Sequence, residues 1–340
     1  MKLKMPNQKK SQEERLLIGT HSGIYQPDEV VAVAILCLYN QDKKVEIIRS
    51  RDMDILKACH ILVDIGEGEF DHHQPGGNGQ RENGIPYASC GLVWNKFGEE
   101  VIRKIYFSIP GLKIKENCEM YKILKEEIDR NIISIVDAED NGKYLENDAV
   151  NLENNHLFSY INTSVPVWYL ELDYDKAFKK VLKTTIRILE QIILKEIEKF
   201  VAGEEIRERC KYVYDAELDR QPYLLQNILE LPNERIPWIE EVVKFNNDNV
   251  SLDKDIINFV IFPCTDGGWA AQAVPPSLEK KFEQKISFPK EWAGQTLKLP
   301  EISGVGDATF CHNELFLVRA KSKEGVKALC AAAVAAMERS

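Results

Sequence analysis

The chain has 340 residues, of which 44% are hydrophobic and 29% charged, an ordinary composition for a globular protein whose length favours two domains. The formal net charge of −10 disfavours a broad surface for long nucleic-acid duplexes, although it is compatible with a local basic groove. No run approaches the roughly 18 uncharged apolar residues needed to cross a bilayer, so we expect no membrane association.

The eight cysteines include no Cys-x-x-Cys pair, and most of them lie among apolar neighbours. This pattern predicts reduced, buried thiols and a cytoplasmic location rather than a disulfide framework. The start of the chain is polar and rich in lysine and has no apolar core, so it does not resemble a secretory signal. We expect residues 1–15 to form a disordered tail.

Short apolar strands then alternate with helices. An apolar strand runs into His21, and Pro27 with the acids behind it marks the start of a helix. A strand over 45–49, a short helix over 54–59 and a buried strand over 61–63 come next. This alternation predicts a parallel sheet in an α/β fold, in which ligands bind at the carboxyl ends of the strands.

Four candidate metal ligands follow the buried strand closely. Asp64 lies at its carboxyl end, and the triplet Asp71-His72-His73 comes after a glycine-containing turn. A carboxylate at a strand end followed by adjacent imidazoles is typical of metal sites in α/β proteins, so the segment predicts metal binding rather than a purely structural role. His21 and Asp28 are expected to face the same edge of the sheet, although Asp28 alone can equally be a helix-capping acid.

Two further helices are predicted over 89–105 and 117–136, where apolar residues recur at three- and four-residue steps. The second ends in an acidic stretch that begins at Asp137, and negative charge there opposes the helix dipole. A bound cation would explain these acids, as would a solvated turn with Gly142 as the cap, and taken alone the turn is favoured. Arg81 lies in a glycine-rich loop from which it can enter the site.

A long apolar periodicity over 174–207 predicts a helix that connects two domains, with packing against a second copy in a homodimer as the alternative. Strands over 256–262 and 269–274 and a closing helix over 323–337 predict an α+β arrangement for the end of the chain. The predicted organisation is a tail over 1–15, an α/β domain over 16–172, a helical connector over 173–245 and a C-terminal α+β domain over 246–340.

The candidate ligands suit a pair of divalent ions. Two imidazoles and three carboxylates are too many for a structural zinc site, which takes four ligands and prefers thiolates. A mixed set with one shared carboxylate favours two Mn²⁺ ions, with Mg²⁺ or Zn²⁺ as alternatives, and such a pair activates water for attack on phosphorus. His73 would orient the substrate or act as a general acid. The candidate ligands are His21, Asp28, Asp64, His72 and Asp137.

Characteristic motifs are spread along nearly the whole chain, from about Leu16 to Met337. They are Gly19-Thr20-His21-Ser22-Gly23, Arg49-Ser50-Arg51-Asp52, Val63-Asp64-Ile65-Gly66, Phe70-Asp71-His72-His73-Gln74, Asn83-Gly84-Ile85-Pro86, Val136-Asp137-Ala138-Glu139-Asp140-Asn141-Gly142, Phe262-Pro263-Cys264, Gln272-Ala273-Val274-Pro275, Phe310-Cys311-His312 and Ala320-Lys321-Ser322-Lys323. The histidine-containing triplet is similar to the motif of the DHH phosphoesterase superfamily. More closely, the chain resembles the MYG (melanocyte proliferating gene) family of metal-dependent exonucleases and their bacterial relatives.

The resemblance implies a DHH-type parallel-sheet domain with flanking helices, a helical connection and a smaller C-terminal domain. The implied activity is a metal-dependent phosphodiesterase, a 3′→5′ exonuclease on RNA or short oligonucleotides, with nucleotides as further candidate substrates. By motif, Asp64 is the carboxylate shared by two ions, His72 and Asp137 complete one ion, His21 and Asp28 serve the other, Asp71 and His73 are catalytic, and Arg51, His312 and Lys321 face the substrate.

Two positions depart from the family pattern. Gln26 stands where the family has histidine, and because an amide oxygen is a weaker neutral ligand than imidazole, its role as a ligand stays open. Arg319 stands in place of a glycine pair, where it can bind phosphate or block close backbone approach. The alternatives are therefore a pseudoenzyme that binds a nucleotide or partner through a weakened metal site, and a hydrolase of another bond type.

Overall fold

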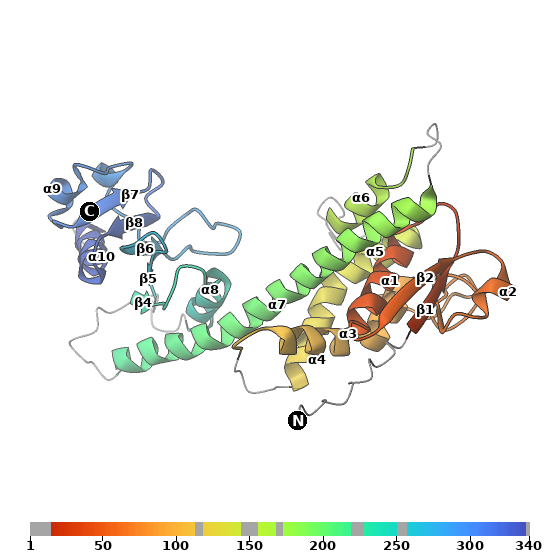
Figure 1. Ribbon diagram of the computed structural model, residues 1–340. Helices are drawn as coiled ribbons and strands as arrows, with labels where there is room; N and C mark the ends of the chain where they lie inside the picture. The colour runs from red at the N-terminus through yellow and green to blue at the C-terminus, as the bar shows by residue number, and fades with distance from the viewer. Residues whose placement is uncertain are drawn as a thin grey trace, which may run out of the picture. The chain divides into compact units, whose positions relative to one another are not determined.

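The computed structural model describes residues 15–112, 118–143, 156–167, 173–218, 228–249 and 257–337 (Figure 1). Its elements are mixed α/β, as predicted. The chain divides into two compact units, unit 1 (Met1–Glu198) and unit 2 (Lys199–Ser340). The boundary lies within α7 (Tyr174–Leu218), and the finer division predicted from the sequence stays a prediction. Most of the expected N-terminal tail, residues 1–14, lies outside the described residues.

Unit 1 contains a parallel sheet of three strands in the order β2-β1-β3. The strands are β1 (Arg15–Thr20), β2 (Lys44–Arg49) and β3 (Ile61–Leu62), and α1 (Pro27–Tyr39) and α2 (Met53–Leu56) make the two crossovers. A parallel sheet aligns the carboxyl ends of its strands, so the segments after β1 and β3 leave the sheet at the same edge.

Helix α1 begins where the sequence predicts, with Pro27 in its first turn and Asp28 and Glu29 behind it. Eleven of its residues are buried, because apolar side chains surround the helix on all sides. It packs against α3 (Ser89–Ser108), the most extensive contact between two elements of the described chain. The two acids of its first turn are therefore carried into the interior on a rigid helix.

The predicted helix over 117–136 is wrong at its end. The structure has α4 (Cys118–Ile128), a π-helical turn (Asp129–Ile133) and α5 (Ser134–Asp140), so helical structure runs through the acidic stretch. The acids lie in the helix because the π-helical turn adds a residue and α5 continues for a further turn. Asp137 and Asp140, three residues apart, consequently lie on one face of α5.

The long periodic segment forms α7, which continues beyond the predicted end at 207 to Leu218. Within unit 1, Phe178 near its start makes an edge-on ring contact with Tyr25, and the preceding helix is α6 (His156–Thr163). Tyr25 also donates a hydrogen bond of 2.6 Å to the carbonyl oxygen of Ser164. These contacts join the beginning of α7 to the segment between β1 and α1.

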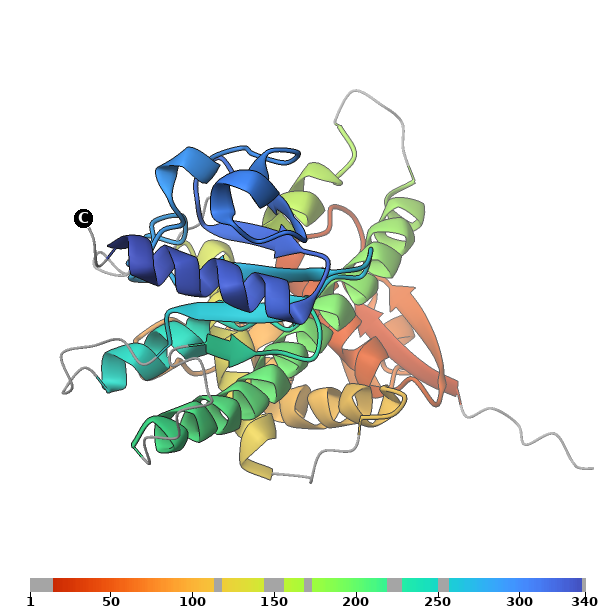
Figure 2. The ribbon, with the colours of Figure 1, turned by 90° about the vertical axis from the view of Figure 1, so that its left-hand side faces the viewer.

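Unit 2 is built on a five-stranded sheet in the order β4-β5-β6-β8-β7, and β5 and β6 form the predicted antiparallel hairpin. Alternate residues of β5 enter two cores, with Phe259 packed on the α10 side and Val260 on the side of α7 and α8. Figure 2 shows α10 along one face of the sheet. The elements are β4 (Ile228–Glu230), α8 (Ile239–Asp248), β5 (Phe259–Pro263), β6 (Trp269–Ala273), a 3₁₀ turn (Lys290–Trp292), α9 (Leu299–Ser303), β7 (Ala308–Cys311), β8 (Leu317–Ala320) and α10 (Lys323–Met337).

None of the helices in the described part of the chain is both long and apolar enough to cross a lipid bilayer.

Candidate metal centre

His21 lies directly after β1 and is buried. Its Nε2 contacts Oε2 of Glu29 and lies 3.3 Å from Oδ2 of Asp64. Burial alone would lower the pKa of His21, but its hydrogen bonds to Asp64 and Glu29 raise the pKa to about 10. In the sequence, Glu29 was interpreted only as part of the helix start. Its position next to Asp28 in the same first turn could have marked it as a further candidate ligand.

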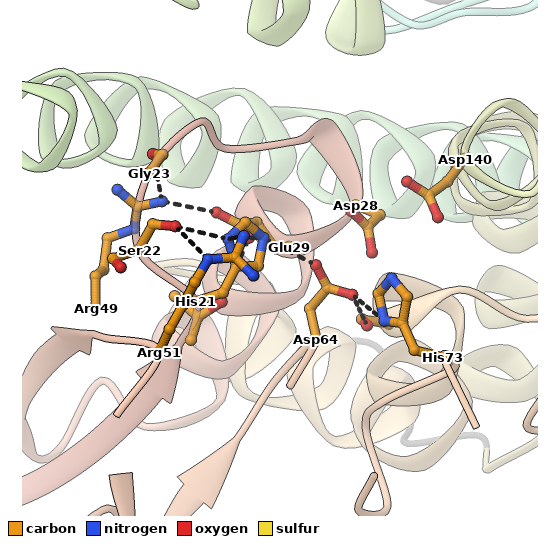
Figure 3. Close-up of polar contacts among 12 residues, drawn as sticks. His21, Ser22, Gly23, Asp28, Glu29, Arg49, Arg51, Asp64, His73 and Asp140 are labelled. Atoms are coloured by element: carbon orange, nitrogen blue, oxygen red, sulfur yellow. Dashed lines mark hydrogen bonds and ion pairs between the residues drawn. The ribbon is translucent and has the colours of Figure 1, made fainter. Parts of the chain in front are cut away.

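Asp64 is the central carboxylate of the site (Figure 3). Its Oδ2 faces His21, whereas its Oδ1 lies 3.4 Å from His72 Nε2 and 3.5 Å from His73 Nδ1. Ser89 donates a hydrogen bond of 3.1 Å to the same Oδ1. Burial works to raise the pKa of Asp64, but contacts with His21 and His72 outweigh it and lower the pKa to about 2. The two oxygens thus serve two different sets of neighbours.

Asp64 also has a left-handed backbone, with φ of 59°. A non-glycine residue there is held against a cost of order 1–3 kcal/mol, so the surrounding turn must impose it. The backbone N–H of Asp64 donates to the carbonyl oxygen of Phe70, and the Asp71 carboxylate accepts from the N–H of Glu67 at 2.7 Å. These bonds close the turn between Asp64 and the histidine pair, and they hold the carboxylate beside the imidazoles.

Asp28, His72 and Asp140 form a further group. His72 Nε2 lies 3.2 Å from Asp140 Oδ2 and 3.9 Å from Asp28 Oδ2. Asp28 is completely buried, and neither of its carboxylate oxygens has a hydrogen-bond partner among the described residues. Burial, reinforced by the charges of Asp64 and Asp140, holds the pKa of Asp28 well above its usual range. A buried carboxylate without donors is costly unless a cation or a proton accompanies it.

Asp137, which was also predicted as a metal ligand, lies outside these groups of candidate ligands. Its Oδ1 accepts hydrogen bonds from the N–H of Gly91 and the thiol of Cys90, both at 3.0 Å, and its Oδ2 lies 2.7 Å from Nη1 of Arg81. Asp140, one helical turn further on, occupies the place beside His72 that the sequence assigned to Asp137. Asp137 was assigned to this ion by the family motif, and the acids that follow it were expected to lie in a turn beyond the helix end. Burial raises the pKa of Asp137 to about 6 although the charge of Arg81 lowers it.

Asp71 and His73 form a pair at the edge of the centre. His73 Nδ1 lies 2.9 Å from Oδ1 of Asp71, and 59% of the His73 side chain is exposed, compared with 9% for His72. Burial would raise the pKa of Asp71, but hydrogen bonds from His73 and Glu67 lower it. Asp71 therefore orients an imidazole that is open to solvent.

A pocket of about 510 Å³ opens on this edge of unit 1. Arg51 lies on its wall, donates a hydrogen bond of 3.2 Å to the carbonyl oxygen of Ser22, and brings Nη2 within 3.5 Å of His21 Nδ1. Gln26 is exposed on the same wall and makes no capping bond to the helix it precedes. The residues that line the pocket include His21, Gln26, Arg51, Asp64, Asp71 and His73.

The remaining predicted residues lie in unit 2. His312 accepts a hydrogen bond of 3.1 Å from the N–H of Glu314 and lies against the ring of Phe316 at 4.3 Å, and Lys321 is exposed. Arg319, on β8, donates to both oxygens of Asp266 and to the carbonyl oxygen of Gly267, so its guanidinium is engaged with the turn between β5 and β6.

The described part of the chain contains three groups of side chains that could hold a metal ion. Within each group, the ligand atoms lie within 4.8 Å of one another. The donor set of carboxylates and imidazoles, with the donor-free Asp28 inside it, fits a divalent metal of intermediate hardness. Asp64 and His72 each belong to two groups, so the groups form one continuous centre. The groups are Asp64 with His72 and His73, His21 with Glu29 and Asp64, and Asp28 with His72 and Asp140.

Comparison with known proteins covers nearly the whole chain. The family model for MYG1 exonucleases, described as an uncharacterised protein family (UPF0160), matches residues 17–334. A MYG1 protein of Chlamydia pneumoniae is 26% identical over 309 residues, which cover 88% of this chain and 90% of the relative. The MYG1 exonuclease of Homo sapiens is 27% identical over 338 residues, which cover 94% of this chain and 85% of the relative. No solved structure matches the chain. The chain therefore belongs to the MYG1 exonuclease family.

Proposed function

We propose that the protein is a metal-dependent phosphodiesterase that removes nucleotides from the 3′ end of short RNA, with two Mn²⁺ ions in the centre of unit 1. The observation that carries this proposal is Asp28, which is buried without a hydrogen-bond donor and faces His72 and Asp140. The printed names of several relatives, among them the human and mouse proteins, are MYG1 exonuclease, which supports a nucleic-acid substrate.

In this proposal Asp64 would help to hold both ions, because its two oxygens face different neighbours. His21 and Glu29 would hold one ion, and His72, Asp28 and Asp140 the other. Divalent ions so placed supply a Lewis acid and lower the pKa of water to near neutrality. The choice of Mn²⁺ rests on the mixture of carboxylate and imidazole donors.

The chain's own side chains would bind and orient the substrate. Arg51 presents a guanidinium to the pocket, where it would pair with a phosphate oxygen. His73 is oriented through Nδ1 by Asp71, which leaves Nε2 to hold or pass a proton at the leaving oxygen. The acidic net charge favours short, single-stranded substrates over long duplexes. His312 and Lys321 are proposed as contacts for the remainder of the strand.

The first test uses the metal-loaded protein and a short RNA labelled at its 5′ end. Asp28→Asn and Asp64→Asn should each lower the rate by about a hundredfold or more, because each removes a charge that holds an ion. Asp54→Asn is the matched control, since Asp54 on α2 is exposed and its side chain pairs with the exposed Lys57 just after the helix. Wild-type rates in the Asp28 and Asp64 variants, or shortening from the 5′ end, would contradict the proposal.

One observation favours the rival, a binding protein with a weakened metal centre. Gln26 is exposed on the pocket wall and brings no imidazole to it. In that case the protein would bind nucleotides or RNA without turnover. The number of ions bound to the chain separates the two.

A further inference from the structure

A second cluster of charged side chains lies next to the metal centre and contributes no atom to its ligand groups. Arg81 donates from Nε and Nη2 to the two oxygens of Asp129, both at 2.7 Å, and its Nη1 lies 2.7 Å from Oδ2 of Asp137. Only 8% of the Arg81 side chain and none of the Asp137 side chain is exposed. The guanidinium also lies over the ring of Tyr87 at 4.5 Å. This cluster ties the 81–87 loop to the π-helical turn and to α5.

Asp137 also provides the cap for the start of α3. The residue in the N-cap position, Ala88, has no side chain that can accept a hydrogen bond, and the carboxylate of Asp137 accepts instead from the N–H of Gly91. Position 91 accommodates only glycine here, because a Cβ would lie 1.8 Å from Asp137 Oδ2. A carboxylate at a helix N-terminus is stabilised by the helix dipole.

The two elements that Asp137 joins each supply a residue to the metal centre. Ser89, in the first turn of α3, donates to Oδ1 of Asp64. Asp140, one turn beyond Asp137 in α5, faces His72 at 3.2 Å. If Asp137 moves, the donor to Asp64 and the carboxylate beside His72 move with it.

We propose that Arg81 and Asp137 are a positioning pair that fixes Ser89 and Asp140 in register for the metal centre. The inference rests on the proposed function, because it assigns a role toward ions held by that centre. The positive charge of Arg81 stabilises the Asp137 carboxylate, and the two hydrogen bonds to Asp129 hold the guanidinium in place, so Asp137 can cap α3 in the interior without a metal ion of its own. Neither residue touches the substrate or an ion.

Removing Arg81 distinguishes this positioning role from a role of Asp137 as a metal ligand, which the family resemblance implies. If Asp137 were a ligand, Arg81 would compete with the ion for its carboxylate, and removing Arg81 would leave ion binding unchanged or make it tighter. If the pair positions Asp140 and Ser89, removing Arg81 weakens ion binding. The two roles therefore predict different effects of removing Arg81 on the affinity of the centre for the ion.

The test is calorimetric titration of metal-free protein with Mn²⁺ for wild type, Arg81→Met, Arg81→Lys and Asp137→Asn. Arg130→Met is the control, since Arg130 lies beside Asp129 in the chain, pairs with Glu127 and is 67% exposed. We expect Arg81→Met and Asp137→Asn to bind Mn²⁺ at least about tenfold more weakly, Arg81→Lys to recover part of the loss, and Arg130→Met to match wild type. If Arg81→Met does not fold, Arg81→Lys is compared with wild type for a smaller loss in the same direction.

A second measurement does not depend on metal. In metal-free protein, amide hydrogen exchange over residues 88–92 should be faster in Arg81→Met than in wild type and Arg130→Met, because the cap of α3 is loosened. Equal exchange in all three would overturn the pairing whether or not ions bind. Mn²⁺ binding to Arg81→Met as tight as or tighter than to wild type, with one ion lost in Asp137→Asn, would make Asp137 a ligand and overturn the inference. Wild type that binds no Mn²⁺ contradicts the proposed function itself.

Discussion

Asp64 and His21 show how the charges of single buried residues are balanced when no metal ion is bound. In the metal-free protein, buried carboxylates and imidazoles face one another without solvent, so protons must balance part of the charge. The pKa of His21 is raised to about 10, and the pKa of Asp28 is raised well above its usual range. At neutral pH the His21 imidazole therefore carries a proton, and burial shifts Asp28 toward its protonated form.

Metal binding should consequently release protons. A metal ion takes the neutral imidazole of His21 and the ionised carboxylate of Asp28, so the proton on His21, together with any proton held by Asp28, must leave when ions enter. At pH 7 we expect release of at least one proton per chain, the one on His21, and a rise in apparent Mn²⁺ affinity of about tenfold per pH unit for each proton released. Calorimetric titration in two buffers of different ionisation enthalpy measures this number. Binding heats that are identical in the two buffers would show that the protons stay.

Several of these residues could be predicted from the sequence, and the others were missed for physical reasons. His21, Asp28, Asp64 and His72 were predicted from strand ends, a helix start and the histidine-containing triplet, and the structure places each of them in one or two of the three ligand groups. Glu29 was missed because an acid in a first turn is common, and Asp140 because the helix was expected to end before the acidic stretch, whereas α5 continues through it.

At the scale of elements, Arg49 connects β2 with α1 and α7. Its guanidinium lies 3.3 Å from Oε1 of Glu29, 2.9 Å from Oδ1 of Asp175, and over the ring of Phe178 at 4.5 Å (Figure 3 shows its contacts with Gly23 and Glu29). Only 3% of the Arg49 side chain is exposed, and Glu29 is fully buried. Arg49 is therefore the cation that balances Glu29 from outside the metal centre.

Replacing Arg49 should destabilise unit 1. Arg49→Met removes one of the two cations that face the buried Glu29 carboxylate and leaves only His21, and breaking one partner of a buried pair costs up to about 3–5 kcal/mol. Lys57→Met is the control, because the Lys57–Asp54 pair is exposed and such pairs contribute about 1 kcal/mol or less. Urea denaturation of the metal-free proteins gives both values. A loss for Arg49→Met no larger than that of the control would mean that Glu29 is protonated or solvated without Arg49.

The elements themselves were predicted well where local pattern decides. The start of α1, the β5–β6 hairpin and α10 follow from proline, turn residues and apolar periodicity. The pairing of Arg81 with Asp129 and Asp137 joins residues 48 or more positions apart, so no local pattern could have indicated it.

At the scale of the whole molecule, all three ligand groups of the described residues lie in unit 1. Saturating metal should therefore stabilise unit 1 and leave unit 2 unchanged. At a concentration of 100 times its Kd, each ion adds about 2.7 kcal/mol, and at roughly 2–4 °C per kcal/mol the Tm of unit 1 rises about 5–11 °C per ion. Scanning calorimetry with and without Mn²⁺ measures the shift. An equal shift of every transition would place the binding elsewhere, and no shift would show that Mn²⁺ does not bind the folded protein.

Two features of the molecule bear on how many ions the chain binds. The centre has ligands for two ions, whereas Gln26 brings no imidazole to the pocket. The most direct test is elemental analysis of protein stripped of metal and reloaded with Mn²⁺. Our account predicts two ions per chain in wild type and fewer in Asp64→Asn, whose carboxylate both ions share. One ion or none in the wild-type protein would contradict the two-metal phosphodiesterase and favour the binding protein.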